Sequence, residues 1–137
     1  MVRETLEWVG TPYHPRARLK GLQGGVDCAL LVAAVMENAG AVKHIDVRRY
    51  VGDEHLHSAE EEYLATVLRH AREIERDTVG PGDFLLWKFG RRLSHAAIVT
   101  EWPRVVHATR LERKVWVCDL SQDLRYQPEL ARYFSPF

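Results

Sequence analysis

Residues 24–40 read GGVDCALLVAAVMENAG, and this stretch decides the fold. Its two leading glycines let the backbone turn tightly into a helix. After Asp27, apolar side chains recur at the offsets that form one face of a helix: Cys28, Leu31, Val32, Val35, Met36 and Ala39. Gly40 is placed to end that helix. The pattern predicts a central buried helix that begins at a cysteine.

The first turn of this helix is a place where a thiol can become reactive. Helix N-termini present unpaired N–H groups and a partial positive charge, which stabilise a thiolate. We therefore expect the pKa of the Cys28 thiol to fall. Asp27 beside it suits two roles, an N-cap for the helix or a carboxylate that holds a substrate ammonium. The sequence leaves both roles open.

The remaining patterns predict an α+β fold in a single domain, residues 1–137. Residues 2–9 suit a short amphipathic helix, residues 11–26 a loop, and a further helix begins at Ser58, which has the capping-box spacing to Glu61. Apolar alternation then predicts four strands, at residues 84–88, 94–100, 105–109 and 114–118. Their short connections indicate an antiparallel meander, with the cysteine-bearing helix packed on one face of the sheet.

The composition excludes several function classes. The 19 basic and 19 acidic residues cancel, so we expect no nucleic-acid partner. No long uncharged apolar run is present, so we expect no membrane insertion. Residues 1–9 lack a signal-peptide core, so we expect the protein to be synthesised in the cytoplasm without a signal peptide. Cys28 and Cys118 would stay reduced there. His55 and His57 form only a weak metal-site pattern, so we predict no metal and no cofactor.

Two histidines on neighbouring predicted strands can serve a nucleophilic cysteine. Alternation gives His95 and His107 a defined face on their strands, and a short hairpin connection would bring the two imidazoles diagonally together. If the start of the helix packs against that face, His95 takes the proton of the Cys28 thiol and His107 orients the His95 ring. Each histidine alone is also explained as a core residue, so the interpretation depends on their joint spacing.

Five segments, in this order, resemble the signatures of NlpC-type cysteine peptidases. They read Trp8-Val9-Gly10-Thr11-Pro12-Tyr13, Gly25-Val26-Asp27-Cys28, Pro81-Gly82-Asp83-Phe84-Leu85, Ser94-His95-Ala96-Ala97-Ile98-Val99 and Val106-His107-Ala108. The resemblance spans most of the chain, from Trp8 to Ala108. It implies a minimal papain-like fold, with N-terminal helices packed on a C-terminal antiparallel sheet.

By this resemblance, Cys28 is the nucleophile, His95 the base and His107 the third member of a triad, while Tyr13 and Asp27 contact the substrate. The implied reaction is hydrolysis of bacterial cell-wall stem peptides between D-γ-glutamate and a diamino acid, without a cofactor. The long link from Tyr13 to Cys28 is most similar to the branch found with phage tails and gene-transfer particles. That similarity implies association with a virion tail and tail-protein partners.

One departure from the family pattern keeps other functions open. Many members have Ser-Gly after the catalytic cysteine, whereas this chain has Ala29-Leu30. The change favours a non-catalytic tail-assembly or structural module that retains the fold. A papain-like amidase is a further alternative, whereas permuted acyltransferases are disfavoured because the cysteine precedes both histidines.

Overall fold

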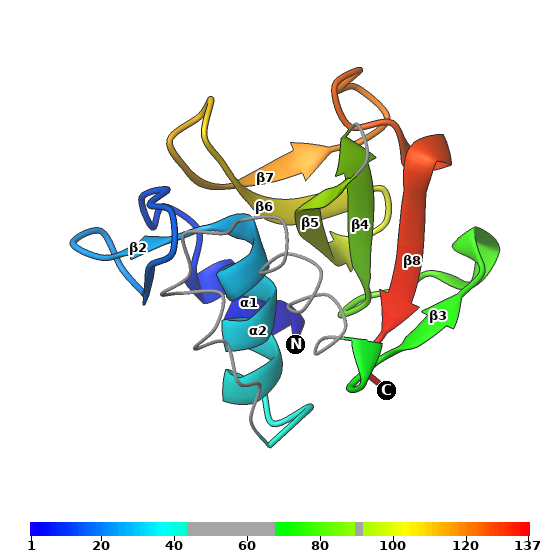
Figure 1. The fold of residues 1–137 in the computed structure, drawn as a ribbon, viewed down its shortest axis with the longest axis horizontal. Coiled ribbons are helices and arrows are strands. Elements are labelled where there is room, and N and C mark those ends of the chain that lie inside the picture. Colours follow the sequence, from blue (N-terminus) through cyan, green and yellow to red (C-terminus); the bar gives the residue numbers. More distant parts are fainter. Residues whose placement is uncertain (44–67, 90–91) are drawn as a thin grey trace.

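A six-stranded antiparallel sheet with helices packed on one face forms the framework of the protein (Figure 1). The computed structural model describes residues 1–43, 68–89 and 92–137. Within these ranges lie two α-helices, α1 (Val2–Glu7) and α2 (Cys28–Asn38). The predicted α+β class is confirmed. The helix expected from Ser58 lies outside the described residues, and the assignment of one domain stays a prediction.

The predicted meander is present in the sheet. Its strands are β4 (Phe84–Phe89), β5 (Arg92–Glu101), β6 (Arg104–Thr109) and β7 (Lys114–Asp119), each pairing antiparallel with the next. Every strand begins and ends within two residues of its predicted bounds. Alternating apolar residues between short turns are therefore sufficient to locate these four strands.

Two further strands of this sheet were not predicted. β8 (Ala131–Ser135) pairs with β4, and β3 (Arg72–Ile74) pairs with β8, so the strand order is β3-β8-β4-β5-β6-β7. After β7 the chain therefore crosses back to the far side of β4 (Figure 1). β3 has only three residues, and both strands pair with segments that are distant in sequence.

Helix α2 is buried on more than the one face that its periodicity predicted. All its residues from Leu30 to Met36 are buried, in a cluster shared with β5 and β6, and α1 also packs against it. Each fully buried leucine or valine contributes about 1.5–3 kcal/mol, so this packing fixes the helix firmly. Gly40 follows with φ of +75°, the left-handed conformation that commonly ends a helix. The position of Cys28 at the other end is thereby set.

Strand alternation divides the core into two clusters on opposite faces of the sheet. The cluster that includes α2 contains Ala96, Ile98, Val106 and Ala108. The second cluster contains Ala97, Val99, Val105 and Cys118. Alternate residues of β5 and β6 therefore face either the helices or the loops that cover the second cluster.

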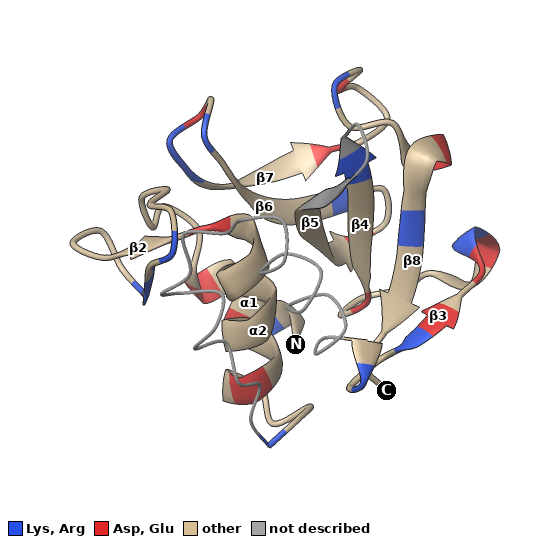
Figure 2. Ribbon diagram, viewed as in Figure 1, with Lys and Arg blue, Asp and Glu red and all other residues tan. Residues whose placement is uncertain are grey.

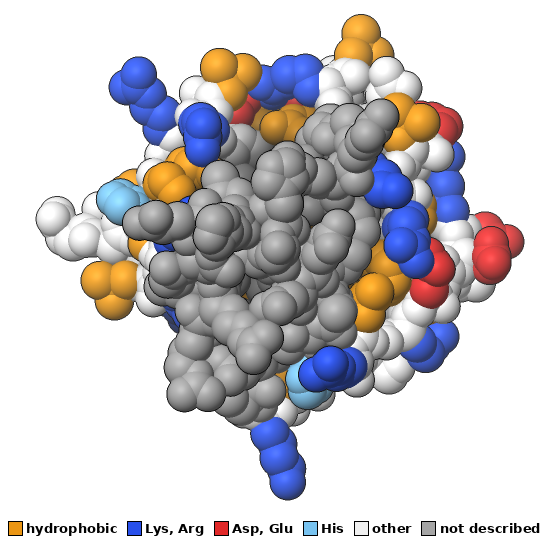
Figure 3. All heavy atoms as spheres, in the orientation of Figure 1, with side chains coloured by type: hydrophobic (Ala, Val, Ile, Leu, Met, Phe, Trp, Pro, Cys, Tyr) orange, Lys and Arg blue, Asp and Glu red, His pale blue; other side chains and the backbone are white. Residues whose placement is uncertain are grey.

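The surface mixes both signs of charge. Figure 2 shows basic and acidic segments interspersed along the strands and loops, and the sequence carries no net charge. In the face drawn in Figure 3, the hydrophobic side chains of the described residues lie among charged and polar ones around the rim. None of the described helices has the length and apolar character needed to cross a bilayer.

Candidate active site

Asp27 fixes where α2 begins. It is only 2% exposed, and its carboxylate accepts two backbone N–H groups, from Leu30 at 2.9 Å and from Arg16 at 2.8 Å. The Leu30 contact is the N-cap bond that satisfies one of the unpaired donors of the first turn. The structure thus gives Asp27 a capping role, and its predicted contact with substrate stays a prediction.

The segment that was predicted to be a loop, residues 11–26, contains a small hairpin. It is formed by β1 (Arg18–Leu19) and β2 (Gly25–Val26), which pair antiparallel. A side chain on Gly24 would lie 1.9 Å from the carbonyl oxygen of Leu19, so only glycine allows the two strands to approach this closely. The hairpin ends directly before Asp27 and delivers the chain into α2.

The Cys28 sulfur lies against β5 at Ala96, the residue that follows His95. The backbone N–H of Ala96 donates a hydrogen bond to it, and the N–H groups of Cys28 and Ala29 also stabilise negative charge there. The β5–β6 register begins at Ile98 and Val106, so β5 is not paired with β6 at Ala96. The Ala96 N–H is therefore left to the sulfur.

The helix does not approach the histidines in the way the sequence suggested. We expected the sheet face that bears them to pack against the start of the helix. Instead α2 packs on the face of Ala96 and Ile98, whereas His95 alternates with Ala97 toward the second cluster. The sulfur meets β5 before its pairing with β6 begins, at the backbone of Ala96 beside His95.

The expected fall in the pKa of the Cys28 thiol is wrong for the unliganded protein. Burial of the sulfur and the nearby negative charge of Asp27 raise this pKa to about 12, despite the three backbone N–H groups. The helix N-terminus is a weaker influence than desolvation, because a thiolate loses its hydration when it is enclosed. At neutral pH Cys28 therefore rests as a thiol.

His95 and His107 contact each other through their rings. Nε2 of His95 and Nδ1 of His107 are 2.8 Å apart and share a hydrogen bond. His95 is 9% exposed and His107 is fully buried, so water competes little for this bond. The strand alternation predicted that the two imidazoles lie together, and the structure brings them together.

Aromatic side chains surround the two imidazoles. Trp87 lies directly across from His95 on β4, and Trp116 directly across from His107 on β7. Tyr126 lies over both imidazoles, with ring centroids 4.7 Å from His95 and 4.8 Å from His107. The histidines therefore sit in a largely apolar enclosure on the second face of the sheet.

This enclosure keeps both imidazoles neutral. Burial lowers the pKa of His95 to about 3, and the neighbouring charge of His107 acts in the same direction. Burial also lowers the pKa of His107 to about 4, partly opposed by Asp123. Nε2 of His107 is buried and has no hydrogen-bond partner among the described residues. At neutral pH the resting site holds a neutral thiol and two neutral imidazoles.

Tyr13 also lies near the cysteine. Its backbone N–H donates to the carbonyl of Arg113 at 2.9 Å, and it forms a bridge with Val26 just before α2. Burial and the nearby Cys28 raise the pKa of its hydroxyl, while a hydrogen bond from Arg110 opposes this. The Arg110 guanidinium lies 5.8 Å from the Tyr13 ring centroid. The structure thus brings the predicted substrate-contacting Tyr13 to the sulfur and adds a cation beside it.

Sequence reasoning missed the aromatic enclosure. Trp87 and Trp116 belong to predicted strands. Each lies directly across from a histidine in the sheet, which could be inferred once the strand register was known. Tyr126 gave no such signal, because it lies in a loop after β7 and reaches the histidines only through the tertiary fold.

Neither the second cysteine nor a metal centre belongs to this site in the part of the chain that the structure describes. The Cys118 thiol is buried on the second face, 3.7 Å from a carboxylate oxygen of Asp123. In residues 1–43, 68–89 and 92–137, no three metal-ligating side chains lie close enough together to hold an ion. His55 and His57 lie outside the described residues.

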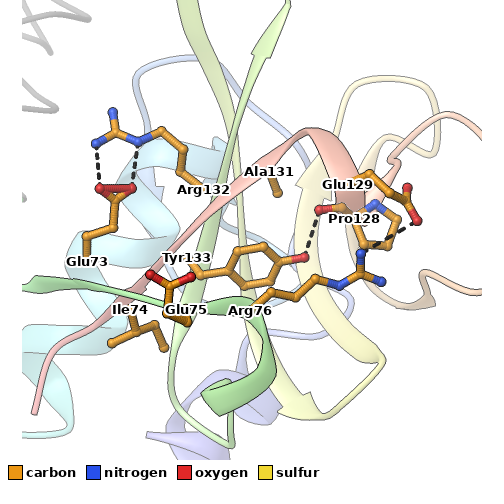
Figure 4. Close-up of a pocket in the computed structure, with 9 residues that line it drawn as sticks. All are labelled: Glu73, Ile74, Glu75, Arg76, Pro128, Glu129, Ala131, Arg132 and Tyr133. Carbon is orange, nitrogen blue, oxygen red and sulfur yellow. Dashed lines mark hydrogen bonds and ion pairs between the residues drawn. The ribbon is translucent and has the colours of Figure 1, made fainter.

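A surface hollow of about 660 Å³ lies elsewhere, between β3 and the segment formed by the short 3₁₀ helix η2 (Pro128–Leu130) and β8 (Figure 4). Two hydrogen bonds of 2.8 and 3.0 Å join Arg132 to Glu73 along its wall, and the Tyr133 hydroxyl donates to the carbonyl of Pro128 at 2.8 Å. These polar groups satisfy one another, and no predicted site residue lines the hollow. We assign it no function.

Known proteins are similar to this chain in structure but not in sequence. Neither protein-family models nor curated protein sequences match the chain. Among solved structures, the NlpC/p60 domain of the peptidoglycan hydrolase SagA is similar with a TM-score of 0.61 at 19% identity, covering 98% of this chain and 93% of that one. NlpC1 from Trichomonas vaginalis gives a TM-score of 0.67 at 13% identity, covering 98% of this chain and 41% of its own.

A third similar structure is a non-catalytic protein. RipD from Mycobacterium tuberculosis, an NlpC/p60 domain protein adapted to peptidoglycan binding, gives a TM-score of 0.59 at 11% identity, with 98% of this chain and 92% of that chain covered. The chain thus has the fold of NlpC/p60 domains over nearly its whole length. The resemblance that the sequence motifs suggested is confirmed at the level of the fold.

Proposed function

We propose that this protein is a cysteine peptidase that hydrolyses stem peptides of bacterial peptidoglycan at D-γ-glutamyl-diamino acid bonds. One observation supports this most strongly. The Cys28 sulfur lies at the start of a buried helix, against the strand position next to His95, and His95 is hydrogen-bonded to His107. A nucleophile, a base and a group that orients the base are the minimum for acyl transfer through a thioester.

The neutral resting state defines how the first step proceeds. Because the thiol and the imidazoles are all uncharged, the proton leaves Cys28 Sγ for Nδ1 of His95 as the sulfur attacks the scissile carbonyl. His95 must then carry its own hydrogen on Nε2 and donate it to Nδ1 of His107. This bond orients the His95 ring so that Nδ1 can take part in the proton transfer.

The later steps use the same groups. The tetrahedral oxyanion accepts the backbone N–H of Cys28, the C–N bond breaks, and His95 gives its proton to the departing amine. Water attacks the thioester with His95 as the base, which releases the acid and restores the thiol. Tyr13, which lies near the sulfur, and Arg110 beside it suit a peptide that carries carboxylates.

We also propose association with a phage or prophage tail and its proteins. This part depends on the sequence pattern, in which the link from Tyr13 to Cys28 is long. In the structure, that link forms the β1–β2 hairpin beside the site. A pull-down of tail proteins with and without residues 14–24 would test it.

The central experiment measures cleavage of defined stem peptides by mass spectrometry. We expect the wild type to release the peptide fragments on either side of the D-γ-glutamyl bond. Cys28→Ala should reduce the rate by at least about 10³-fold while circular dichroism stays unchanged. The buried Cys118 offers a matched control, and Cys118→Ala should keep cleaving.

Two outcomes of this experiment contradict the proposal. Equal cleavage by wild type and Cys28→Ala would show that another group or a contaminant does the chemistry. Cleavage at the bond that joins the peptide to the sugar would instead indicate an amidase.

A second candidate is a non-catalytic peptidoglycan-binding module. The raised pKa of the Cys28 thiol, the lowered pKa of His95 and the Ala29-Leu30 sequence all favour it. RipD is an example of such a protein on this fold. Co-sedimentation of the wild type with purified peptidoglycan, without release of any fragment, would identify this function.

A further inference from the structure

A loop after β7 places an aromatic ring over the histidine pair. Tyr126 lies in the segment between β7 and η2 (Pro128–Leu130). Its ring plane is tilted 31° to that of His95 and 71° to that of His107, so it stacks on one imidazole and meets the other edge-on. It also contacts Trp87 edge-on at 5.8 Å. Tyr126 is half-buried, so one part of its ring covers the imidazoles and another part is exposed to water.

An arginine holds this loop in place. Arg125 donates to Glu112 at 2.7 Å and to Asp123 at 2.8 and 3.1 Å, and its guanidinium lies 5.6 Å from the Tyr126 ring centroid. Glu112 belongs to the turn between β6 and β7, whereas Asp123 belongs to the loop of Tyr126. We call these three residues, Arg125, Glu112 and Asp123, the Arg125 clamp. It joins two loops that approach the histidines from different strands.

The clamp is more than a single surface ion pair. The Arg125 backbone N–H also donates to Asp123 at 3.0 Å, and the Thr109 hydroxyl donates to Glu112. Arg125 lowers the pKa of Asp123 to about 2, so the carboxylate stays charged across the neutral range. Isolated exposed ion pairs contribute little to stability, but a network with several bonds in fixed geometry restrains a loop.

We propose that Tyr126 is a positioning residue that covers the His95–His107 pair, and that the Arg125 clamp holds it there. The ring keeps water from the hydrogen bond between the two imidazoles. The effect of Tyr126 on turnover rests on the proposed function, whereas its effect on the protonation of the histidines does not.

Several charged or titratable groups face the two histidines. Glu112, from the β6–β7 turn, favours the charged form of His95. Asp123, from the Tyr126 loop, favours the charged form of His107, and Arg125 opposes it. Cys28, from the start of α2, is near enough to Tyr126 to affect its hydroxyl. Because burial is the largest influence on both histidines, removal of the covering ring should raise their pKa values.

Imidazole nitrogen NMR tests the proposal without reference to hydrolysis. In the wild type we expect both rings to stay neutral from pH 7 to pH 5. In Tyr126→Ala we expect the pKa values of the imidazoles to rise by about one unit or more, because water reaches the rings. The rings should then be partly protonated within that pH range. Tyr126→Phe keeps the ring and should match the wild type.

The ion pair of Arg132 with Glu73 is a matched control for the clamp and lies toward the opposite edge of the sheet. Arg132 binds Glu73 through two hydrogen bonds, and its side chain is 49% exposed against 44% for Arg125. Loss of the Arg125 charge itself favours protonation of His107, so the clamp is tested at His95. Arg125→Ala should shift the His95 titration in the same direction as Tyr126→Ala, whereas Arg132→Ala should not. Unchanged imidazole signals in Tyr126→Ala, or equal shifts in Tyr126→Phe, would overturn the proposal.

Turnover measurements separate this proposal from the proposed function. With an active wild type, Tyr126→Ala should lower kcat by about tenfold or more with little change in KM, because the base is displaced. Tyr126→Phe should retain most of kcat. If no form of the protein cleaves stem peptides while the imidazole shifts occur as expected, the hydrolase function fails and the positioning role of Tyr126 stands.

Discussion

At the scale of single residues, Asp27 has two opposing effects. Its carboxylate accepts the N–H groups of Leu30 and Arg16 and so defines the start of α2. The same charge helps to raise the pKa of the Cys28 thiol. The residue that places the nucleophile thus also keeps it protonated. For the reaction, this means that proton removal by His95 must accompany the attack.

Two substitutions of Asp27 separate these effects. Asp27→Ala removes both acceptors and should lower the free energy of unfolding by about 2 kcal/mol. Asp27→Asn keeps one acceptor oxygen and should cost less, while loss of the charge lowers the pKa of the Cys28 thiol. Urea unfolding measures the first effect. The second is measured by iodoacetamide alkylation against pH in a Cys118→Ala background, where an unchanged profile for Asp27→Asn would contradict it.

At the scale of elements, the β1–β2 hairpin depends on a close backbone approach. The carbonyl group of Leu19 fills the space beside Gly24. A methyl group on Gly24 would lie 1.9 Å from the carbonyl oxygen and 2.7 Å from the carbonyl carbon of Leu19. Backbone atoms cannot move aside as a flexible side chain can. The hairpin and the residues after it, including Cys28, must therefore shift if Gly24 gains a side chain.

We expect Gly24→Ala to lower the free energy of unfolding by about 1–3 kcal/mol and to change the alkylation rate of Cys28. Gly80 is the control, since nothing lies within 4 Å of the position of its added methyl group. Gly80→Ala should stay within about 0.5 kcal/mol of the wild type. Equal stability of the two variants in urea would show that the hairpin adjusts without cost.

At the scale of the whole molecule, two buried neutral histidines make the fold sensitive to acid. The unfolded chain protonates histidine below about pH 6.5, whereas burial lowers the pKa to about 3 for His95 and about 4 for His107 in the folded protein. Their contribution to stability is therefore complete above pH 6.5 and is lost as the pH falls toward 3.

Between pH 7 and pH 5 the free energy of unfolding should fall by about 2 kcal/mol for each histidine. His107→Gln should reduce this pH dependence by about half, although it also costs the bond to His95. Urea titrations at half-unit steps of pH measure the slope. A stability that is flat from pH 7 to pH 5 would mean that the histidines gain protons as readily in the folded protein as in the unfolded chain.

Local patterns were sufficient for much of the fold. The glycine pair, the apolar period after Cys28 and the alternation from Phe84 to Cys118 predicted α2, the four-strand meander and the α+β class. The same alternation predicted that His95 and His107 lie together. These features depend on neighbours within a few residues, which the sequence shows directly.

Only the tertiary structure decided the rest. Three features join segments that are distant in sequence: the pairing of β3 and β8, the approach of the sulfur to the backbone of Ala96, and the covering ring of Tyr126. The pKa of Cys28 rose where the helix N-terminus alone predicted a fall. The reason is that desolvation depends on everything that encloses a group, and the order of residues along the chain does not contain that information locally.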